Sequence, residues 1–400
     1  MKSHKLVSLL VLVLACSSKS SEFGDGGGGG NDGGNDGGPI TTSDGGCVFC
    51  GVDGSSGGDG SVPCVPNPAN YDIPGNGCDD DGDGKVDNVA VCDSSLPATG
   101  TAMQMAQAMG LCQQASSSAW GVVSATFTQG YGNSTAPDAH QTSILGTFGN
   151  ALKPREGGSF GILSSGYAQA SDSCPTNQRY QGMAGTSFKY GCAMTGQGAA
   201  PSGFPKSATG CPSQQNEAVN DVVDLQLKIK VPANANGFSF DFDFGSGEWP
   251  EFVCSPFNDA FIAYLKSAAF NNGTPDNISF DSKNNPVSVN NGFFSECGPA
   301  NAATGCNAQA TPGTAACTGG TTNLVGTGFY DLGDQSACAT GETGGGMTGW
   351  LTTQAPAQPS ETITIDLIIW DTGDQFYDSS VILDNWTWKP HPVAVSTQPN

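Results

Sequence analysis

The feature that most constrains the fold is a run of alternating phenylalanine and polar residues near the middle of the 400-residue chain. It reads FSFDFDF and covers residues 238–244. Successive side chains of a β-strand point to opposite faces of a sheet. The run therefore predicts a strand with its four phenylalanines on one face, and with Asp241 and Asp243 on the opposite, solvated face.

Other segments alternate in the same way. VVDLQLKIKVP has apolar residues at 223, 225, 227, 229 and 231, and ETITIDLIIWDTGD has them at 363, 365, 367 and 369. Short strand-like runs separated by Gly, Asn and Pro follow one segment with helical spacing, at 99–116. Strands at short spacing without intervening helices predict a mainly β fold. We expect a large antiparallel, jelly-roll-like β-sandwich with one N-terminal helix, preceded by a disordered tether.

The N-terminus has the pattern of an exported lipoprotein. Lysines precede an apolar run at 6–14 that is too short to span a bilayer, and Val13-Leu14-Ala15-Cys16 resembles a bacterial lipobox. We expect residues 1–15 to be a signal peptide and Cys16 to carry a lipid that makes the membrane a partner. An ordinary cleaved signal is the alternative. Residues 16–63 are rich in Gly and Asp, which predicts a disordered tether.

The charge of the chain restricts the kinds of partner that it can bind, and its cysteine content bears on whether it forms disulfides. The chain has 37 acidic and 14 basic residues, a formal charge of -23, which disfavours nucleic acid as a partner. Of its 15 cysteines, an even number remains once Cys16 is assigned to the lipid. After export, these predict disulfides. A zinc ribbon built from Cys47, Cys50, Cys64 and Cys78 is the alternative.

Residues 64–94 contain an aspartate pattern typical of calcium loops. Carboxylates alternate, and a glycine follows where such a loop turns sharply. The ligands that we expect are Asp79, Asp81, Asp83 and Asp87, with Val86 packing below the loop. Ala90 stands where an EF-hand has its bidentate glutamate, so we expect weak Ca²⁺ binding. A solvated acidic turn is the alternative.

A second set of carboxylates surrounds the ends of predicted strands. Like charges that gather in this way repel unless a cation joins them, so we expect Ca²⁺ there. The predicted ligands are Glu251, Asp259, Asp371, Asp374 and Asp378.

Two alternatives remain for this set. One is a glycosidase acid/base pair made by Glu248 or Asp371 with Glu251, or a glycan-binding module. The side chains that would stack on sugars are those of Trp249, Trp370, Trp386 and Trp388. The other is that Asp and Asn side chains cap their own turns.

Several motifs, in order, resemble the choice-of-anchor L domain family of bacterial surface proteins. They are SATFTQGYG, ILGTFG with GILSSG, FSFDFDFGSGEWPEFVCSPFNDAFIAYL, NISFDSKNNPVSVNNGFF and IDLIIWDTGDQFYDSSVILD. Gly247 and Trp249 replace the usual Glu and Tyr, whereas Glu248, Pro250 and Glu251 are retained. The acidic segment at 64–94 also resembles a Cys-Asp-Gly metal-binding motif of Gram-negative surface proteins.

The family resemblance implies an exported β-sandwich without enzymatic activity. We expect this domain at 95–391, followed by a C-terminal tail at 392–400. The expected protein is a lipoprotein of the outer membrane or cell surface of a Gram-negative bacterium. Its expected role is non-catalytic adhesion or surface interaction, stabilised by Ca²⁺, with a surface glycan or surface protein as partner. The alternative is a carbohydrate-binding or glycoside-hydrolysing surface module.

Overall fold

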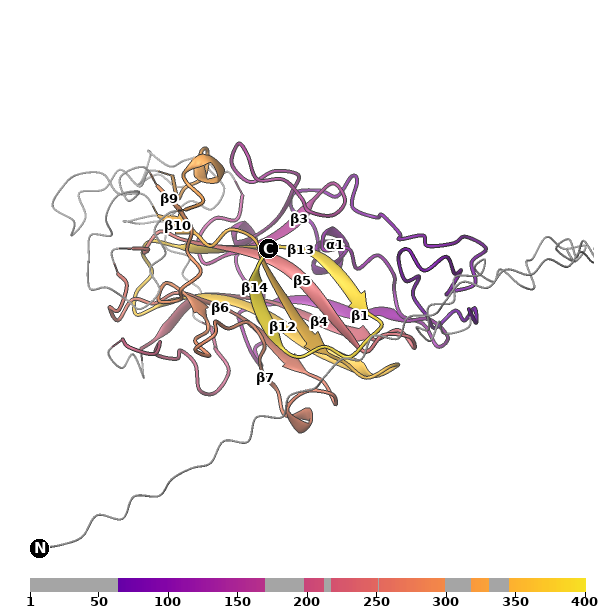
Figure 1. Ribbon diagram of the computed structural model, residues 1–400. Helices are drawn as coiled ribbons and strands as arrows, with labels where there is room; N and C mark the ends of the chain where they lie inside the picture. Colours follow the sequence, from indigo (N-terminus) through magenta and orange to yellow (C-terminus); the bar gives the residue numbers. More distant parts are fainter. Residues whose placement is uncertain (1–63, 170–197, 212–216, 251, 299–317, 331–344) are drawn as a thin grey trace, which may run out of the picture. The chain divides into compact units, whose positions relative to one another are not determined.

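The computed structural model describes residues 64–169, 198–211, 217–250, 252–298, 318–330 and 345–400 (Figure 1). The predicted signal peptide, Cys16, the predicted tether and Glu251 lie outside these ranges. Pro63–Asn400 forms one compact unit. Among the described residues, no helix has the length and apolar character needed to cross a membrane.

Two antiparallel sheets make up this unit, which confirms the predicted mainly β sandwich. The first has the order β1-β4-β12-β6-β7, and β8 also pairs with β6. Its strands are β1 (Gly121–Thr128), β4 (Val219–Lys230), β12 (Thr362–Thr372), β6 (Ala260–Lys266), β7 (Asp276–Asn277) and β8 (Val287–Ser288).

The second sheet has the order β14-β11-β5-β13-β3-β2. Its strands are β14 (Ser396–Pro399), β11 (Leu351–Pro356), β5 (Gly237–Ser246), β13 (Ser379–Lys389), β3 (Phe160–Ser164) and β2 (Thr142–Leu145). A short strand, β10 (Gly346–Met347), pairs with β5 and with β9 (Glu296–Cys297). Residues 396–399, which fall in the predicted tail, thus add a strand to the sheet beyond residue 391.

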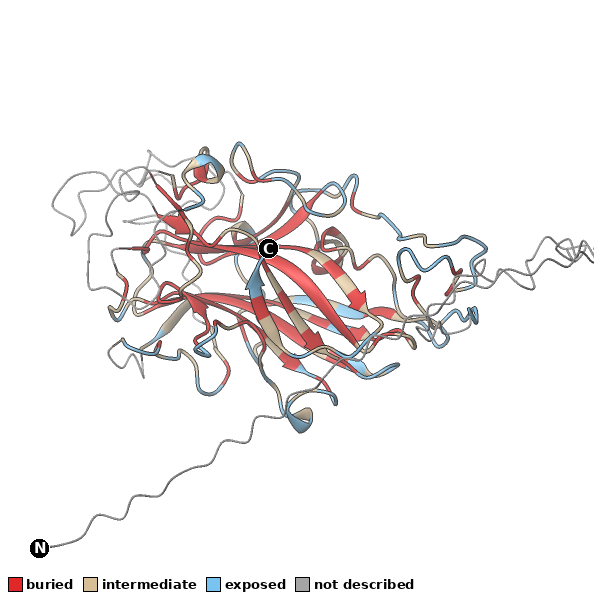
Figure 2. Cartoon of the chain, in the orientation of Figure 1, coloured by how far each residue is buried: buried red, intermediate tan, exposed pale blue. Residues whose placement is uncertain are grey.

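The core between the sheets consists of the side chains that alternation predicted. All four phenylalanines of β5 are fully buried, as are the alternating apolar residues of β4 and β12. Trp386 of β13 stacks on Phe238, with ring centroids 4.4 Å apart. Figure 2 shows that buried residues follow the strands of both sheets.

The opposite face of β5 is also buried, so the expectation of a solvated face is wrong. Asp241 is 1% exposed and Asp243 is fully buried. A second apolar cluster, which includes Phe148 and Phe329, covers the outer face of this sheet. The Arg155 guanidinium forms an ion pair with Asp241, with Nε and Oδ2 2.7 Å apart. The polar side chains of β5 therefore form a buried polar layer, and a third layer of the chain covers it.

The predicted helix is shorter than its apolar spacing indicated. α1 spans Ala102–Ala108, and Thr101 caps it in a capping box with Gln104. Gly110 has φ +90°, a left-handed conformation that ends helices. Cys112, which lies beyond this turn, is bonded to Cys92. The helical pattern thus continues in the sequence past the point at which the backbone leaves the helix.

The segment before α1 is attached to the sandwich by hydrogen bonds and disulfides. The amide of Asn234 and the backbone of Tyr71 exchange two hydrogen bonds, at 3.0 and 2.8 Å. The Tyr71 hydroxyl donates to the Trp388 carbonyl at 3.0 Å. Cys64 is bonded to Cys78, which contradicts their assignment to a zinc ribbon. A third disulfide joins Cys211 to Cys254.

Candidate calcium sites

The predicted N-terminal calcium segment forms a surface acidic loop, which we define as residues 70–88. Asp72, Asp79 and Asp81 each provide a carboxylate oxygen, and these oxygens lie within 4.8 Å of one another. Within the described ranges, no other three acidic, His or Cys side chains meet this condition. Such a set of oxygens is the kind of ligand that Ca²⁺ prefers.

Backbone hydrogen bonds shape this loop. The Asp79 carboxylate accepts hydrogen bonds from the N–H groups of Gly82 at 2.8 Å and Gly84 at 2.9 Å. The Asp72 carboxylate accepts one from the N–H of Asp80 at 2.8 Å. The aspartates therefore also cap their own turns, as the alternative interpretation expects.

Two of the predicted ligands do not join this set. The Asp87 carboxylate accepts a hydrogen bond from the N–H of Asn76 at 3.1 Å. Asp83 accepts one from the N–H of Lys85, which lowers the pKa of this carboxyl. Val86 is 56% exposed, so the expectation that it packs below the loop is wrong. No helix flanks this loop directly within the described residues.

The second predicted site lies where strands of both sheets meet. Antiparallel pairing places the starts of β4 and β6 beside the end of β12, and the start of β13 beside the end of β5. Acidic residues occupy or adjoin all five of these strand ends. We call them the buried acidic cluster, and its members are Asp221, Glu248, Asp259, Asp371, Asp374 and Asp378.

Asp259 links three segments of this cluster. Its Oδ1 accepts a hydrogen bond from the Thr372 N–H at 3.0 Å, and its Oδ2 accepts one from the Ser379 hydroxyl at 2.7 Å. Its own N–H lies 3.4 Å from Oε2 of Glu248. The Asp259 carboxylate thus connects the end of β12 to the start of β13, and its backbone N–H faces the segment after β5.

A β-bulge brings Asp221 into the cluster. The register between β4 and β12 shifts between Ile369 and Asp371, and Asp221 has φ +51°. A non-glycine residue in this conformation costs on the order of 1–3 kcal/mol, and such strain concentrates at functional sites. The charge of Asp221 is one of those that raise the pKa of Asp371.

Burial dominates the electrostatics of the cluster. Desolvation raises the pKa of Asp259 to about 7. Desolvation raises the pKa of Glu248 well above its ordinary value, and the charges of Asp259 and Asp374 raise it further. The pKa of Asp371 rises first through burial and then through the charges of Asp259 and Asp378. Burial also raises the pKa of Asp374, which lies nearer the surface.

The carboxylate of Asp371 lies deep within the cluster. It is 1% exposed; burial and the charges of its acidic neighbours raise its pKa, and hydrogen bonding to Ser165 acts in the opposite direction. Buried carboxylates must take up protons or pair with cations. Among the described cluster members, no three carboxylate oxygens lie as close together as those of the surface acidic loop. A bound cation would therefore have to bring the carboxylates of the cluster closer together.

The structure adds residues that sequence reasoning missed. Asp72 belongs to the same aspartate-rich stretch as Asp79, and that proximity was its only signal. Asp221 had none, because its position depends on the bulge. Glu248 joins the cluster, although the sequence interpretation placed it in an acid/base pair. The predicted ligand Glu251 lies outside the described residues.

The tryptophans proposed to bind sugars are buried, so that expectation is wrong. Trp249, Trp370, Trp386 and Trp388 are between 0% and 6% exposed. Trp370, for example, donates a hydrogen bond from Nε1 to Thr372 at 3.0 Å. These rings fill the protein interior and cannot stack on an external ligand. The acid/base pair involving Glu251 stays a prediction.

The fold and its disulfides define a class: β-sandwich proteins that mature in an oxidising compartment. Residues 212–388 match the family model of the choice-of-anchor L domain, so this part of the chain is a choice-of-anchor L domain. The family indicates a surface-associated bacterial protein. Every member of the buried acidic cluster lies within the matched residues, and the surface acidic loop precedes them. No curated protein and no solved structure matches the chain.

Proposed function

We propose that this protein is a non-catalytic surface-interaction protein, anchored through a lipid on Cys16 and stabilised by Ca²⁺. The observation that carries the calcium proposal is the buried acidic cluster, above all the carboxylate of Asp371, whose pKa burial and neighbouring acidic charges raise. Ca²⁺ takes about six to eight oxygen ligands and tolerates irregular geometry, which suits carboxylates that come from five strand ends.

Calcium would act as a cross-link between the two sheets. Glu248 and Asp378 adjoin strands of the second sheet, whereas Asp221, Asp259 and Asp371 belong to or adjoin strands of the first. A cation held by both groups would oppose their separation and keep the connections at this edge in place. We propose that those connections present the interaction surface, in an environment where calcium is plentiful.

Thermal unfolding of the full-length protein tests the proposal. A ligand that binds only the folded state at a hundredfold excess over its Kd adds about 2.7 kcal/mol of stability. For a folded unit of this size we expect Tm to rise by about 4 °C in Ca²⁺ relative to a chelator. Equal Tm values in the two conditions would overturn the calcium proposal.

Matched variants assign the response to one site. Asp371→Asn should abolish most of the calcium-dependent rise. Without calcium it should leave Tm unchanged or raise it, because it removes a buried charge. Asp366→Asn is the control, because Asp366 is buried in the same strand but bonds to Gln226 at 2.7 Å, outside the cluster. Asp79→Asn measures the contribution of the surface acidic loop.

The lipid anchor has a separate test. Metabolic labelling with a radioactive fatty acid should label the natural protein, and Cys16→Ala should abolish the label and release the protein from the membrane fraction. Cys47→Ala is a matched control, because Cys47 also lies in the predicted N-terminal segments but outside the lipobox. Label that persists in Cys16→Ala would contradict lipid attachment at this residue.

A further inference from the structure

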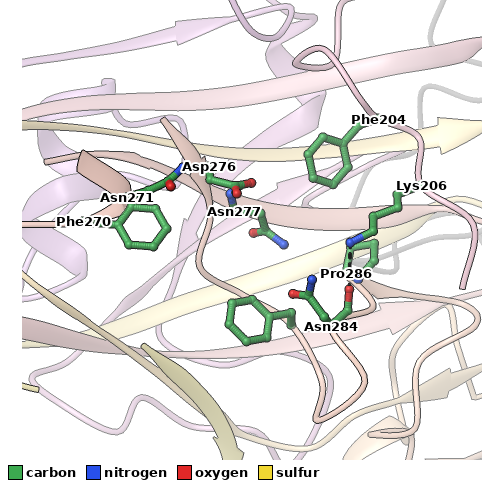
Figure 3. Close-up of a pocket in the computed structure, with 9 residues that line it drawn as sticks. Phe204, Lys206, Phe270, Asn271, Asp276, Asn277, Asn284 and Pro286 are labelled. Carbon is green, nitrogen blue, oxygen red and sulfur yellow. Dashed lines mark hydrogen bonds between the residues drawn. The ribbon is translucent and has the colours of Figure 1, made fainter. Parts of the chain in front are cut away.

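A pocket of about 320 Å³ opens on the first sheet, and none of the residues that line it belongs to either acidic site. Its walls come from the segment around 204–206, the β6–β7 connection and the β7–β8 connection. Figure 3 shows Phe270 and Asn271 at one end, and Phe204 and Lys206 at the other. A volume of this size lies at the lower end of the range for small-molecule sites, about 300 to 1,000 Å³.

The lining combines half-buried aromatic rings with amide groups. Phe204, Phe270 and Phe280 are each partly exposed. Phe204 is held in place by edge-on contacts with Tyr264 and Trp370, at centroid distances of 6.4 and 6.2 Å. Three rings around one opening give a ligand flat apolar surfaces to contact.

Three asparagine side chains line the pocket. One of them is fixed by hydrogen bonds within the protein, and the other two are available to a ligand. Asn277 accepts hydrogen bonds from the N–H groups of Ala263 at 3.1 Å and Ser279 at 3.0 Å, so its side chain is fixed. The exposed side chains of Asn271 and Asn284 form no hydrogen bond to other residues that the structure describes. Each of these amides provides both donors and an acceptor.

The charged groups of the pocket balance each other. Lys206 donates a hydrogen bond to the Asn284 carbonyl at 3.0 Å, which joins two walls that are distant in sequence (Figure 3). Asp276 supplies one negative charge at the rim. One charge of each sign leaves the lining without a net charge, whereas the chain as a whole, at -23, repels anions.

We infer that this pocket binds an uncharged pyranose ring, the end of a neutral surface glycan. Such a ring has C–H faces for the phenylalanines, and its hydroxyl groups can both donate to and accept from amides and a carboxylate. The inference deepens the proposed surface-interaction function, on which it rests, by naming the ligand class. It assigns the binding to phenylalanines of the segments beside the first sheet rather than to tryptophans.

Binding of the full-length protein to an array of neutral and acidic glycans tests the inference. Asn271→Ala and Asn272→Ala form a matched pair, because both residues are exposed, adjacent and left-handed, at φ +48° and +53°. Only Asn271 lines the pocket. We expect binding of neutral glycans, a loss of about tenfold in Asn271→Ala, equivalent to about 1.4 kcal/mol, and no loss in Asn272→Ala. Phe280→Ala should weaken binding at least as much.

Three outcomes would overturn the inference: no neutral glycan bound, equal loss in both asparagine variants, or a preference for acidic glycans. The calcium-dependent Tm rise, measured on the same samples, keeps this result separate from the proposed function. Absence of glycan binding with an intact Tm rise rejects the pocket alone. If Phe280→Ala fails to fold, the asparagine pair still decides.

Discussion

In a chelator, the protein is expected to lose stability as the pH rises from about 5 to about 8. The pKa of Asp259 is about 7 in the folded state, and an unfolded aspartate has a pKa of about 4. Between these values the folded state holds a proton that the unfolded state has lost. Stability therefore falls with rising pH, by about 3 kcal/mol for one such group over this interval.

Calcium should reverse this dependence. Bound Ca²⁺ requires ionised carboxylates, so its affinity increases as the pH rises. Chemical denaturation at several pH values, with Ca²⁺ and with chelator, would measure both curves. Asp259→Asn should flatten the curve in chelator. The pKa of Asp384 is also raised to about 7, so Asp384→Asn shows how much of the slope arises outside the cluster. Stability that rises with pH in chelator would contradict this account.

A second large effect is expected from Arg155→Met. Arg155 is the ion-pair partner of Asp241, which is 1% exposed within the second sheet. Removing one partner leaves a buried charge uncompensated and typically costs about 3–5 kcal/mol. Thr352 and Asn385 also donate hydrogen bonds to this carboxylate, at 2.5 and 2.8 Å, but they supply no charge.

Urea unfolding of a double-mutant cycle measures this pair. Asp241→Asn in the Arg155→Met background should recover most of the loss, because the asparagine needs no counter-charge. Lys85→Met is a control on an exposed ion pair, that of Lys85 with Asp83, and should change stability by less than about 1 kcal/mol. If Arg155→Met costs as little as Lys85→Met, Asp241 is compensated by its hydrogen bonds alone.

Alternation in the sequence was sufficient to predict the core of the sandwich. In β4, β5 and β12 the apolar residues that alternate in the sequence are the ones buried between the sheets. This follows because each sheet packs one of its faces against the other sheet. The same rule failed for Asp241 and Asp243. Whether the second face of a strand meets water depends on a third layer formed by residues such as Phe148 and Phe329, which are remote in sequence.

The acidic sites were predictable only in part, for a related reason. Asp259, Asp371 and Asp378 adjoin strand ends that antiparallel pairing brings together, and predicted strands suffice to expect that. Asp221 enters through a bulge that no sequence pattern marks. The extent of burial, which makes the charges costly, also depends on the folded structure rather than on any motif.

The attachment of residues 70–72 to the sandwich has a mechanical consequence. If the protein is held at its N-terminus, a pulling force enters the folded unit near Cys64. The covalent bond to Cys78 passes that force on without lengthening. The load then reaches the hydrogen bonds between Tyr71, Asn234 and Trp388. Together with the hydrogen bond from the Ala233 N–H to the Ala69 carbonyl at 2.8 Å, these contacts would bear tension before the strands of the sheets do.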